Sequence, residues 1–205
     1  MIEFLEKCGY IKNPKVRSAM LKVKREDFVP QEYRSNAYSN TPLPIPGGMT
    51  ISAEHMHAIF LSELKLKAGD RVIEIGAGSG ILLAYMKEIV GRRGKVFGTE
   101  INFETYEFAK ENLKKTGYWD KVKLIHADGS KGLSQFAPFD KIISSAAPVK
   151  KIPKEWIDQL KPGGILITPL GPTYAQDLIY LEKTKNGKII RKNLGAVVFV
   201  ELVEK

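Results

Sequence analysis

The sequence predicts a doubly wound α/β fold with a mostly parallel sheet, antiparallel C-terminal strands and an N-terminal helical cap. Three observations support this prediction. From about residue 70, short apolar segments rich in β-branched residues alternate with amphipathic segments of helical period. The apolar segments lack polar alternation, which is typical of parallel strands covered on both faces. Two apolar segments near the end are separated by an Asn-Gly pair, which predicts an antiparallel hairpin with a two-residue turn.

The chain of 205 residues is long enough for one well-buried core. Residues 1–50 are expected to form a helical cap and a loop that contacts the substrate, and residues 51–205 a single globular domain. Within the cap, Val16, Met20 and Val23 recur at helical spacing before Pro30 interrupts the pattern.

The segment TPLPIPGGMTIS, residues 41–52, packs three prolines and two glycines in front of an amphipathic run. A helix is expected from about Ser52 to Lys67, with Met56, Ile59, Phe60 and Leu64 on one face. Serine is a preferred N-cap residue, so Ser52 is predicted to cap this helix.

The remaining elements follow in order along the chain. Five parallel strands are expected in RVIEIG (71–76), KVFGTE (95–100), VKLIHAD (122–128), DKIISSAAP (140–148) and GGILITPLG (163–171). Helices are expected in ILLAYMKEIVG (81–91) and ETYEFAKENLKKTG (104–117). The antiparallel tail comprises DLIYLEK (177–183), the turn TKNGK (184–188), and then IIRK (189–192) and AVVFVELV (196–203).

The glycine-rich motif VIEIGAGSG, residues 72–80, is the strongest signal for a ligand pocket. A strand runs into Gly76, Ala77, Gly78 and Gly80, where glycines allow a tight turn and close approach to a ligand. The loop suits either a dinucleotide or S-adenosylmethionine. The dinucleotide fingerprint would place its third glycine at position 81, which is isoleucine here.

Acidic residues end three successive predicted strands. Glu74 would repel a pyrophosphate but suits a cationic amino group, so a diphosphate ligand is disfavoured. Glu100 is placed to accept hydrogen bonds from ribose hydroxyls of either cofactor. Asp128, followed by Gly129, is placed where methyltransferases commonly hold the adenine amino group. Any one of these acids could be a loop cap, but together with the glycine loop they favour S-adenosylmethionine.

Composition limits the other function classes. The net charge of +9 raises the question of nucleic acid, but lysines interleaved with glutamates along the chain indicate a solvated surface. No apolar run is long enough to cross a bilayer, and no standard export signal is recognised. The lone Cys8 fits a reducing, cytoplasmic compartment. His55 and His57 point to different sides of their helix, so no metal site is expected.

The chain resembles protein-L-isoaspartate O-methyltransferases along most of its length. The matching pieces are PLPIPGGMTISAEHMHA, VIEIGAGSG, HADGSKGL, APFDKIISSAAP and LKPGGILITPLG. Pro46 and Met49 stand where family members usually carry glycine and glutamine. The resemblance implies the Rossmann-like methyltransferase form of the sheet. It also implies methyl transfer from S-adenosylmethionine to the free carboxyl of isoaspartyl residues in damaged proteins and peptides, a repair reaction.

The resemblance also implies roles for individual residues. Ser52 corresponds to the active-site serine of the family, and His55 would line the cofactor pocket. Substrate contacts are expected from Thr50, Ile51 and Ser52, and Ala146 and Ala147 would shape the pocket wall. Neither nucleic acid nor a membrane is expected as a partner, and the sequence does not specify an oligomeric state.

Three alternatives remain open from the residues themselves. An RNA or small-molecule methyltransferase would suit the positive charge, although SSAAP (144–148) lacks the N/D-P-P-Y platform of base-amino methyltransferases. A nicotinamide oxidoreductase is disfavoured by the glycine spacing and Glu74. A non-catalytic S-adenosylmethionine-binding or interaction module would be excluded only by turnover.

Overall fold

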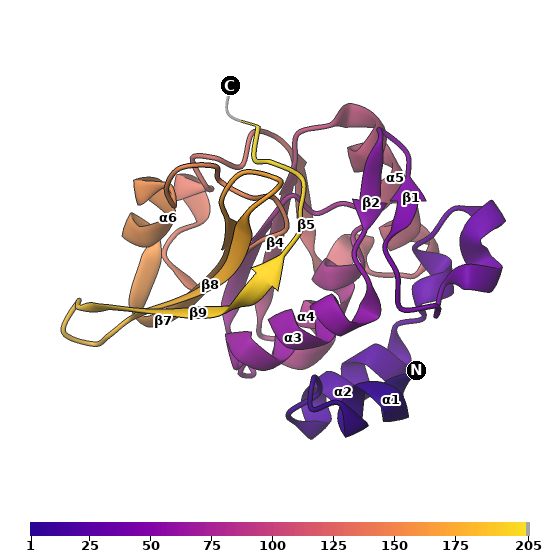
Figure 1. Cartoon of the computed structure of the whole chain (residues 1–205), viewed down its shortest axis with the longest axis horizontal. Coiled ribbons are helices and arrows are strands. Elements are labelled where there is room, and N and C mark those ends of the chain that lie inside the picture. Colours follow the sequence, from indigo (N-terminus) through magenta and orange to yellow (C-terminus); the bar gives the residue numbers. More distant parts are fainter. Residues whose placement is uncertain (204–205) are drawn as a thin grey trace.

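The computed structural model describes residues 1–203 and contains a seven-stranded sheet (Figure 1). The strand order is β5-β4-β3-β6-β7-β8-β9. Strands β3 to β7 are parallel to one another, whereas β8 runs antiparallel to both β7 and β9. The strands are β3 (Arg71–Ile75), β4 (Lys95–Glu100), β5 (Lys123–His126), β6 (Phe139–Ser144), β7 (Leu160–Leu170), β8 (Gln176–Lys183) and β9 (Ile189–Val197). The predicted fold class is confirmed.

Alternate residues of each central strand enter two different cores, which explains the unbroken apolar runs. Ile73 and Ile75 of β3 pack with Trp156 in a cluster on one face of the sheet. Val72 points to the other face, where it joins a larger cluster formed with several helices. Both faces are therefore buried, as expected for parallel strands.

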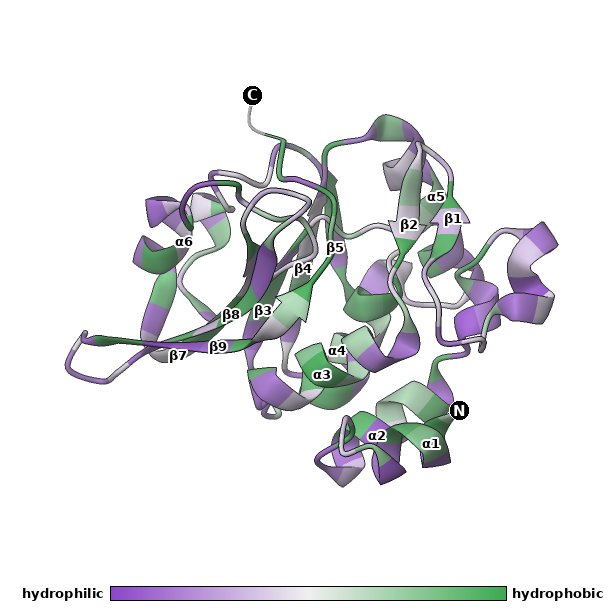
Figure 2. Ribbon diagram, in the orientation of Figure 1, coloured by the Kyte–Doolittle hydropathy of each residue, from purple (hydrophilic) through white to green (hydrophobic). Residues whose placement is uncertain are grey.

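Helices of the N-terminal half cover one face, and α6 covers the other. The α-helices are α1 (Ile2–Lys7), α2 (Pro14–Lys22), α3 (Glu54–Leu64), α4 (Ile81–Val90), α5 (Phe103–Lys115) and α6 (Lys154–Asp158). Short 3-10 helices are η1 (Arg25–Asp27), η2 (Gln31–Asn36), η3 (Trp119–Lys121) and η4 (Ser134–Phe136). Figure 2 shows hydrophobic residues along much of α3, which lies between the sheet and the N-terminal helices. Within residues 1–203, no helix is both long and apolar enough to span a bilayer.

The proline-glycine segment forms a separate hairpin of β1 (Leu43–Ile45) and β2 (Met49–Ile51). A domain boundary after residue 50 would therefore fall inside β2. The division of the chain into a cap and a catalytic domain stays a prediction, and residues 204 and 205 of that domain lie outside the described part.

The helix that follows this hairpin is shorter than predicted. It begins at Glu54, its N-cap is Ala53, and no side chain caps it. Ser52 instead lies between the end of β2 at Ile51, which is paired with Leu43, and the N-cap Ala53. The helix ends at Leu64 because Lys65 adopts a left-handed conformation with φ of 51°. The predicted N-cap role of Ser52 is therefore wrong.

The C-terminal hairpin is confirmed, but its connection is longer than two residues. The backbone of Thr184 donates to the carbonyl of Lys188 at 2.8 Å, which leaves three residues between them. Gly187 supplies the positive φ of 82° that closes this turn. After β9 the chain turns back across the carboxyl edge of the sheet as residues 198–203, which we call the C-terminal strap (Figure 1).

Candidate active site

A pocket of about 730 Å³ opens at the carboxyl ends of the central strands. It lies near the point between β3 and β6 where the strand order reverses, which is where open α/β sheets bind ligands. Its lining includes β2 with the start of α3, the glycine loop after β3, the end of β4, and the C-terminal strap. Residues that follow β5 and β6, and residues 173–177 around the start of β8, complete it.

The glycine loop contributes Gly76, Ala77 and Gly78 to the pocket wall. Gly78 has φ of 54°, and a Cβ there would meet only the Ile45 Cδ1 atom, at 3.9 Å. The predicted close approach to a ligand is therefore sterically open at this position. Gly80 is not among the pocket-lining residues, because it starts α4 and a Cβ there would lie 3.2 Å from Leu113.

Glu74 is the most deeply buried acid of the pocket, with only 2% of its surface exposed. The Ser145 hydroxyl donates to its Oε1 at 3.0 Å, whereas its Oε2 has no protein partner among residues 1–203. Burial raises the pKa of Glu74 well above its usual range, the Ser145 hydrogen bond opposes this, and the charge of Glu100 adds to it. A buried carboxylate oxygen without a partner is costly unless a ligand supplies a donor or a positive charge.

Glu100 connects the glycine loop to the segment that follows β4. Its Oε2 accepts from the Gly78 N–H at 3.0 Å, and its Oε1 accepts from the Asn102 N–H at 3.0 Å. Burial raises the pKa of Glu100, and these backbone hydrogen bonds act in the opposite direction. The carboxylate therefore holds the loop in place and lies at the pocket wall, as predicted.

The predicted third acid is placed differently from the other two. Asp128 accepts a hydrogen bond from the Ser130 N–H at 2.7 Å and is not among the residues that line the pocket. Its neighbours Ala127 and Gly129 do line it. Gly129 has no room for a side chain, since a Cβ would lie 2.4 Å from the Thr99 Oγ1 atom.

The tip of the β1–β2 hairpin is fastened to the start of α5. The Thr105 hydroxyl donates to the Pro46 carbonyl at 2.8 Å, and Asn102 Nδ2 donates to the Gly47 carbonyl at 3.2 Å. Gly47 has φ of 83°, and a Cβ there would lie 2.4 Å from Thr105 Oγ1. Pro46 and Gly47 therefore dock the hairpin tip onto the start of α5.

Replacing Gly47 with alanine is expected to displace the hairpin tip and raise the KM for substrate peptide about tenfold. The Cβ would clash with α5 as well as straining the backbone, which alone costs about 1 to 3 kcal/mol. Gly48→Ala is a matched control, because Gly48 has φ of 70° but nothing within 4 Å of its Cβ position. Equal KM values for the two variants would contradict a role for hairpin docking.

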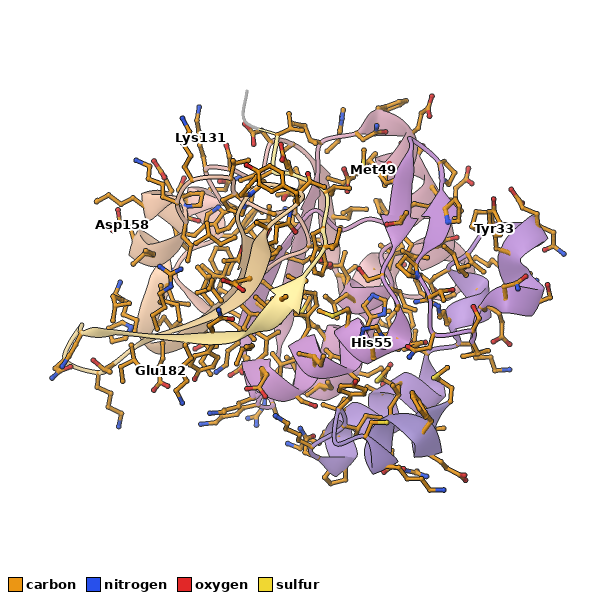
Figure 3. The ribbon with its side chains drawn as sticks, in the orientation of Figure 1. Tyr33, Met49, His55, Lys131, Asp158 and Glu182 are labelled. Atoms are coloured by element: carbon orange, nitrogen blue, oxygen red, sulfur yellow. The ribbon has the colours of Figure 1, made fainter. Side chains whose placement is uncertain are left out.

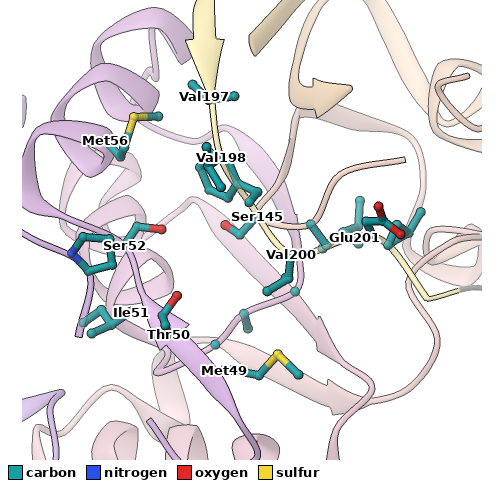
Figure 4. Close-up of a pocket in the computed structure, with 18 of the residues that line it drawn as sticks. Met49, Thr50, Ile51, Ser52, Met56, Ser145, Val197, Val198, Val200 and Glu201 are labelled. Carbon is teal, nitrogen blue, oxygen red and sulfur yellow. The ribbon is translucent and has the colours of Figure 1, made fainter. Parts of the chain in front are cut away.

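The predicted substrate contacts Thr50, Ile51 and Ser52 all line the pocket. In Figure 4 the hydroxyls of Thr50, Ser52 and Ser145 point into the same space. The Ser52 carbonyl accepts a hydrogen bond from Arg25 Nη1 at 2.6 Å, whereas its hydroxyl points into the pocket (Figure 4). The hydroxyl is thus available to a ligand.

The two predicted histidines differ in environment. His55 lines the pocket at the start of α3 (Figure 3), and both its backbone N–H and Nδ1 lie 3.0 Å from Asn40 Oδ1. Burial lowers the pKa of His55 and of His57, and His57 Nδ1 lies 3.7 Å from Glu54 Oε2. Asn40 therefore satisfies one of the backbone N–H groups at the start of α3. Among residues 1–203, no three His, Cys, Asp or Glu side chains could together hold a metal ion.

The C-terminal strap closes the pocket on the side opposite β2. The Gln176 side chain clamps the strap backbone: its Nε2 donates to the Phe199 carbonyl at 3.0 Å and its Oε1 accepts from the Phe199 N–H at 2.7 Å. Ala147 also pairs with the strap, exchanging backbone hydrogen bonds of 2.8 Å with Val200 and Leu202. Ala146 lines the pocket as predicted, whereas Ala147 is fully buried and holds the strap instead.

Replacing Gln176 with leucine is expected to loosen the strap and weaken cofactor and peptide binding about tenfold. The change leaves two buried backbone groups of Phe199 unsatisfied, at about 1 to 3 kcal/mol each. Gln159→Leu is a matched control, since the Gln159 side chain also makes two hydrogen bonds to backbone groups. Its Oε1 accepts from the Leu133 N–H and its Nε2 donates to the Lys131 carbonyl, away from the pocket. Both variants should lower the Tm, but only Gln176→Leu should change the binding constants. Unchanged binding in Gln176→Leu would contradict a closing role for the strap.

Sequence reasoning missed several residues that build the site. Asn102 could have been found, because an Asn before an amphipathic run signals a helix N-cap, and it does cap α5. Thr99, Ser145 and Gln176 carried no such signal. The Thr99 hydroxyl is buried in the pocket wall without a protein partner among residues 1–203, as is Glu74 Oε2. These two atoms fit a ligand that brings both a cationic amino group and polar atoms.

The sheet order, the glycine loop and the acids ending β3 and β4 define a Rossmann-like methyltransferase. The profile of the protein-L-isoaspartate(D-aspartate) O-methyltransferase family matches residues 1–205. The chain therefore belongs to this family. It is 50% identical to the protein-L-isoaspartate O-methyltransferase of Methanococcus aeolicus, covering 100% of this chain and 93% of the relative. It is 43% identical to that of Methanopyrus kandleri, covering 99% and 89%.

Solved structures agree with this assignment. A Plasmodium falciparum protein-L-isoaspartate O-methyltransferase in complex with S-adenosyl-L-homocysteine superposes with a TM-score of 0.87 at 32% identity, covering 100% of this chain and 97% of that one. These comparisons do not favour the nicotinamide oxidoreductase, the RNA or small-molecule methyltransferase, or the non-catalytic module.

Proposed function

We propose that this pocket binds S-adenosylmethionine at the glycine loop and orients an isoaspartyl carboxyl group for methylation beside Ser52. The observation that carries the proposal is that Glu74 Oε2 is buried without a protein partner among residues 1–203, in the wall of the same pocket into which the Ser52 hydroxyl points. The family acts on isoaspartyl residues of proteins, which supports a damaged protein or peptide as the acceptor.

The cofactor end of the pocket would bind the cationic amino group and the ribose hydroxyls of S-adenosylmethionine at two different places. Glu74 would accept the amino group of the methionine moiety, and Gly76, Ala77 and Gly78 would let it approach the backbone. Glu100 lies at the wall where a ribose would be held, and Gly129 and Thr99 narrow the adjoining space. His55 would complete the wall near α3. A role for Asp128 would be indirect, through the loop that it holds with Ser130.

The acceptor end requires no general base. A carboxyl group with a pKa near ~4 is already ionised at neutral pH. The Ser52 hydroxyl would donate to one carboxylate oxygen and leave the other free to attack. Thr50, Ile51 and Ala146 would hold the peptide around it. When bound, S-adenosylmethionine supplies a methyl group on a positively charged sulfur, so catalysis depends mainly on alignment, worth up to roughly 7 to 11 kcal/mol in model systems.

The strap and the hairpin flank this acceptor site from opposite sides. Val198 and Val200 of the strap face Thr50 and Ser52 of the hairpin side across the pocket in Figure 4. Their side chains would exclude water from the reacting carboxylate and so strengthen its interaction with Ser52. The lone cysteine supports a reducing, cytoplasmic setting for this repair activity.

A matched pair of peptides tests the proposed function. One peptide contains an isoaspartyl residue, and the other contains normal aspartate at the same position. With labelled S-adenosylmethionine, we expect base-labile label on the first peptide alone. Equal labelling of both peptides, or label that resists base, would overturn the proposal.

A further inference from the structure

A buried cluster of polar side chains contacts the backbone of Ser52. It consists of Arg25 from η1, Glu54 from α3 and Tyr85 from α4, which are 0%, 2% and 0% exposed. The Tyr85 hydroxyl donates to Glu54 Oε1 at 3.1 Å. The proposed mechanism uses none of these three side chains. Burying an arginine requires compensation, so the cluster calls for a reason.

Arg25 contacts both ends of the β1–β2 hairpin. Its Nη1 donates to the Ser52 carbonyl at 2.6 Å, and its Nη2 donates to the Thr41 carbonyl at 3.4 Å. Thr41 precedes β1, and Ser52 directly follows β2. A planar guanidinium with donors in a fixed fork can hold two carbonyls in a defined relation, which a lysine ammonium cannot. The hairpin that carries Thr50 is therefore closed at its base by one side chain.

A carboxylate of the same cluster partly offsets the cost of burying Arg25. Burial lowers the pKa of Arg25, and the charge of Glu54 opposes this effect. Glu54 in turn accepts a hydrogen bond from the Tyr85 hydroxyl. Glu54 and Ser52 flank Ala53. The Glu54 carboxylate therefore lies only two residues from the Ser52 carbonyl, to which Arg25 donates its hydrogen bond. The cluster thus combines a donor for Ser52, a counterion and a support for that counterion.

We propose that Arg25 is a positioning residue for methyl transfer, which fixes the Ser52 backbone and thereby aims the Ser52 hydroxyl into the pocket. The inference rests on the role proposed for Ser52. A donor displaced by a fraction of an ångström loses alignment with the reacting carboxylate, so the loss should fall on kcat rather than on cofactor affinity.

A double-mutant cycle separates positioning from a purely structural role. The variants are Arg25→Lys, Ser52→Ala and both together, assayed with isoaspartyl peptide at saturating S-adenosylmethionine. We expect Arg25→Lys to lower kcat about tenfold while the cofactor Kd changes less than about threefold. In the Ser52→Ala background, the same change should lower kcat by less than about threefold, because no hydroxyl remains to be aimed.

Arg71→Lys is the matched control. Arg71 Nη1 donates to the Phe136 carbonyl at 2.8 Å, and this bond lies at the amino end of β3, away from the pocket. Its kcat should stay within about twofold of the unchanged enzyme. Thermal unfolding and cofactor Kd, measured on every variant, show whether each remains folded.

The outcomes distinguish two failures. If Ser52→Ala alone leaves kcat unchanged, the serine has no catalytic role and the Arg25 proposal falls with it, while methylation of the isoaspartyl peptide would still stand. If Ser52→Ala lowers kcat but the losses of the two variants multiply, the proposal for Arg25 alone is overturned. An unchanged kcat in Arg25→Lys would overturn it as well.

Discussion

Replacing Glu74 with glutamine is expected to weaken S-adenosylmethionine binding about 10- to 150-fold. Glutamine keeps the size of the side chain and can still accept the Ser145 hydrogen bond, but it removes the negative charge beside the open position at Oε2. A hydrogen bond to a charged group is worth about 1.5 to 3 kcal/mol, and each 1.4 kcal/mol is about tenfold in affinity. Isothermal titration calorimetry measures this loss.

Glu104→Gln is a suitable control for this variant, because Glu104 is an exposed carboxylate in the first turn of α5. It removes the same net charge without touching the pocket. Equal losses in the two variants would mean that general electrostatic attraction, and not a specific contact at Glu74, governs cofactor affinity.

Cofactor affinity is expected to rise with pH through the elevated pKa of Glu74. Burial favours the protonated carboxyl in the free enzyme, whereas a bound cationic amino group favours the carboxylate. Binding should therefore release a proton at pH values below the elevated pKa. Titrations in buffers of different ionisation enthalpy detect this release, and its persistence in Glu74→Gln would assign it to another group.

The same pKa predicts how the stability of the ligand-free enzyme depends on pH. Because the folded-state pKa of Glu74 is raised, the folded state binds more protons than the unfolded state between the two pKa values. The free energy of unfolding should therefore fall as pH rises above the ordinary glutamate pKa and through the elevated one. Glu74→Gln should remove this part of the slope, which Tm measurements across the pH range would show.

Replacing Ser52 with alanine is expected to lower kcat about 100-fold while leaving the Kd for S-adenosylmethionine nearly unchanged. The hydroxyl faces the acceptor end of the pocket, and a carboxylate that loses this donor is held less well in line with the methyl group, where a misplacement of about 1 Å can cost about 10²-fold. Single-turnover rates with isoaspartyl peptide measure the effect free of product release.

Ser145→Ala provides the opposite pattern for comparison. The Ser145 hydroxyl donates to Glu74, so its loss should change cofactor affinity more than kcat. The contrast between the two serine variants tests whether the pocket binds the methyl donor and the methyl acceptor at separate ends. If Ser52→Ala alters the cofactor Kd as strongly as kcat, Ser52 belongs to the cofactor site and not to the acceptor site.

Much of the fold could be predicted because local pattern and burial coincide there. The parallel strands are predictable because the central ones are apolar on both sides, and β3 contributes Val72 to one core and Ile73 to the other. The glycine loop and Glu74 were recognised because a tight turn at a strand end leaves few chemical alternatives.

The rest depends on contacts between segments distant in sequence. Serine is a preferred N-cap residue, but the helix starts beyond Ser52, at Glu54. The Ser52 carbonyl instead accepts a hydrogen bond from Arg25, 27 residues earlier in the chain. Nothing in the local sequence distinguishes Gln176 from an ordinary strand residue, because its hydrogen bond to Phe199 exists only once the C-terminal strap has folded back. No local pattern specifies such pairings, because they follow from topology.

The carboxylate of Glu100 has a consequence for kinetic measurements. One of its oxygens holds Gly78 of the glycine loop, and the other holds Asn102, whose side chain in turn holds the hairpin at Gly47. The glycine loop, where the methyl donor would bind, and the β1–β2 hairpin, beside the methyl acceptor, are thus connected through one series of hydrogen bonds. Steady-state data should accordingly show synergy between the two substrates, with each lowering the Michaelis constant of the other.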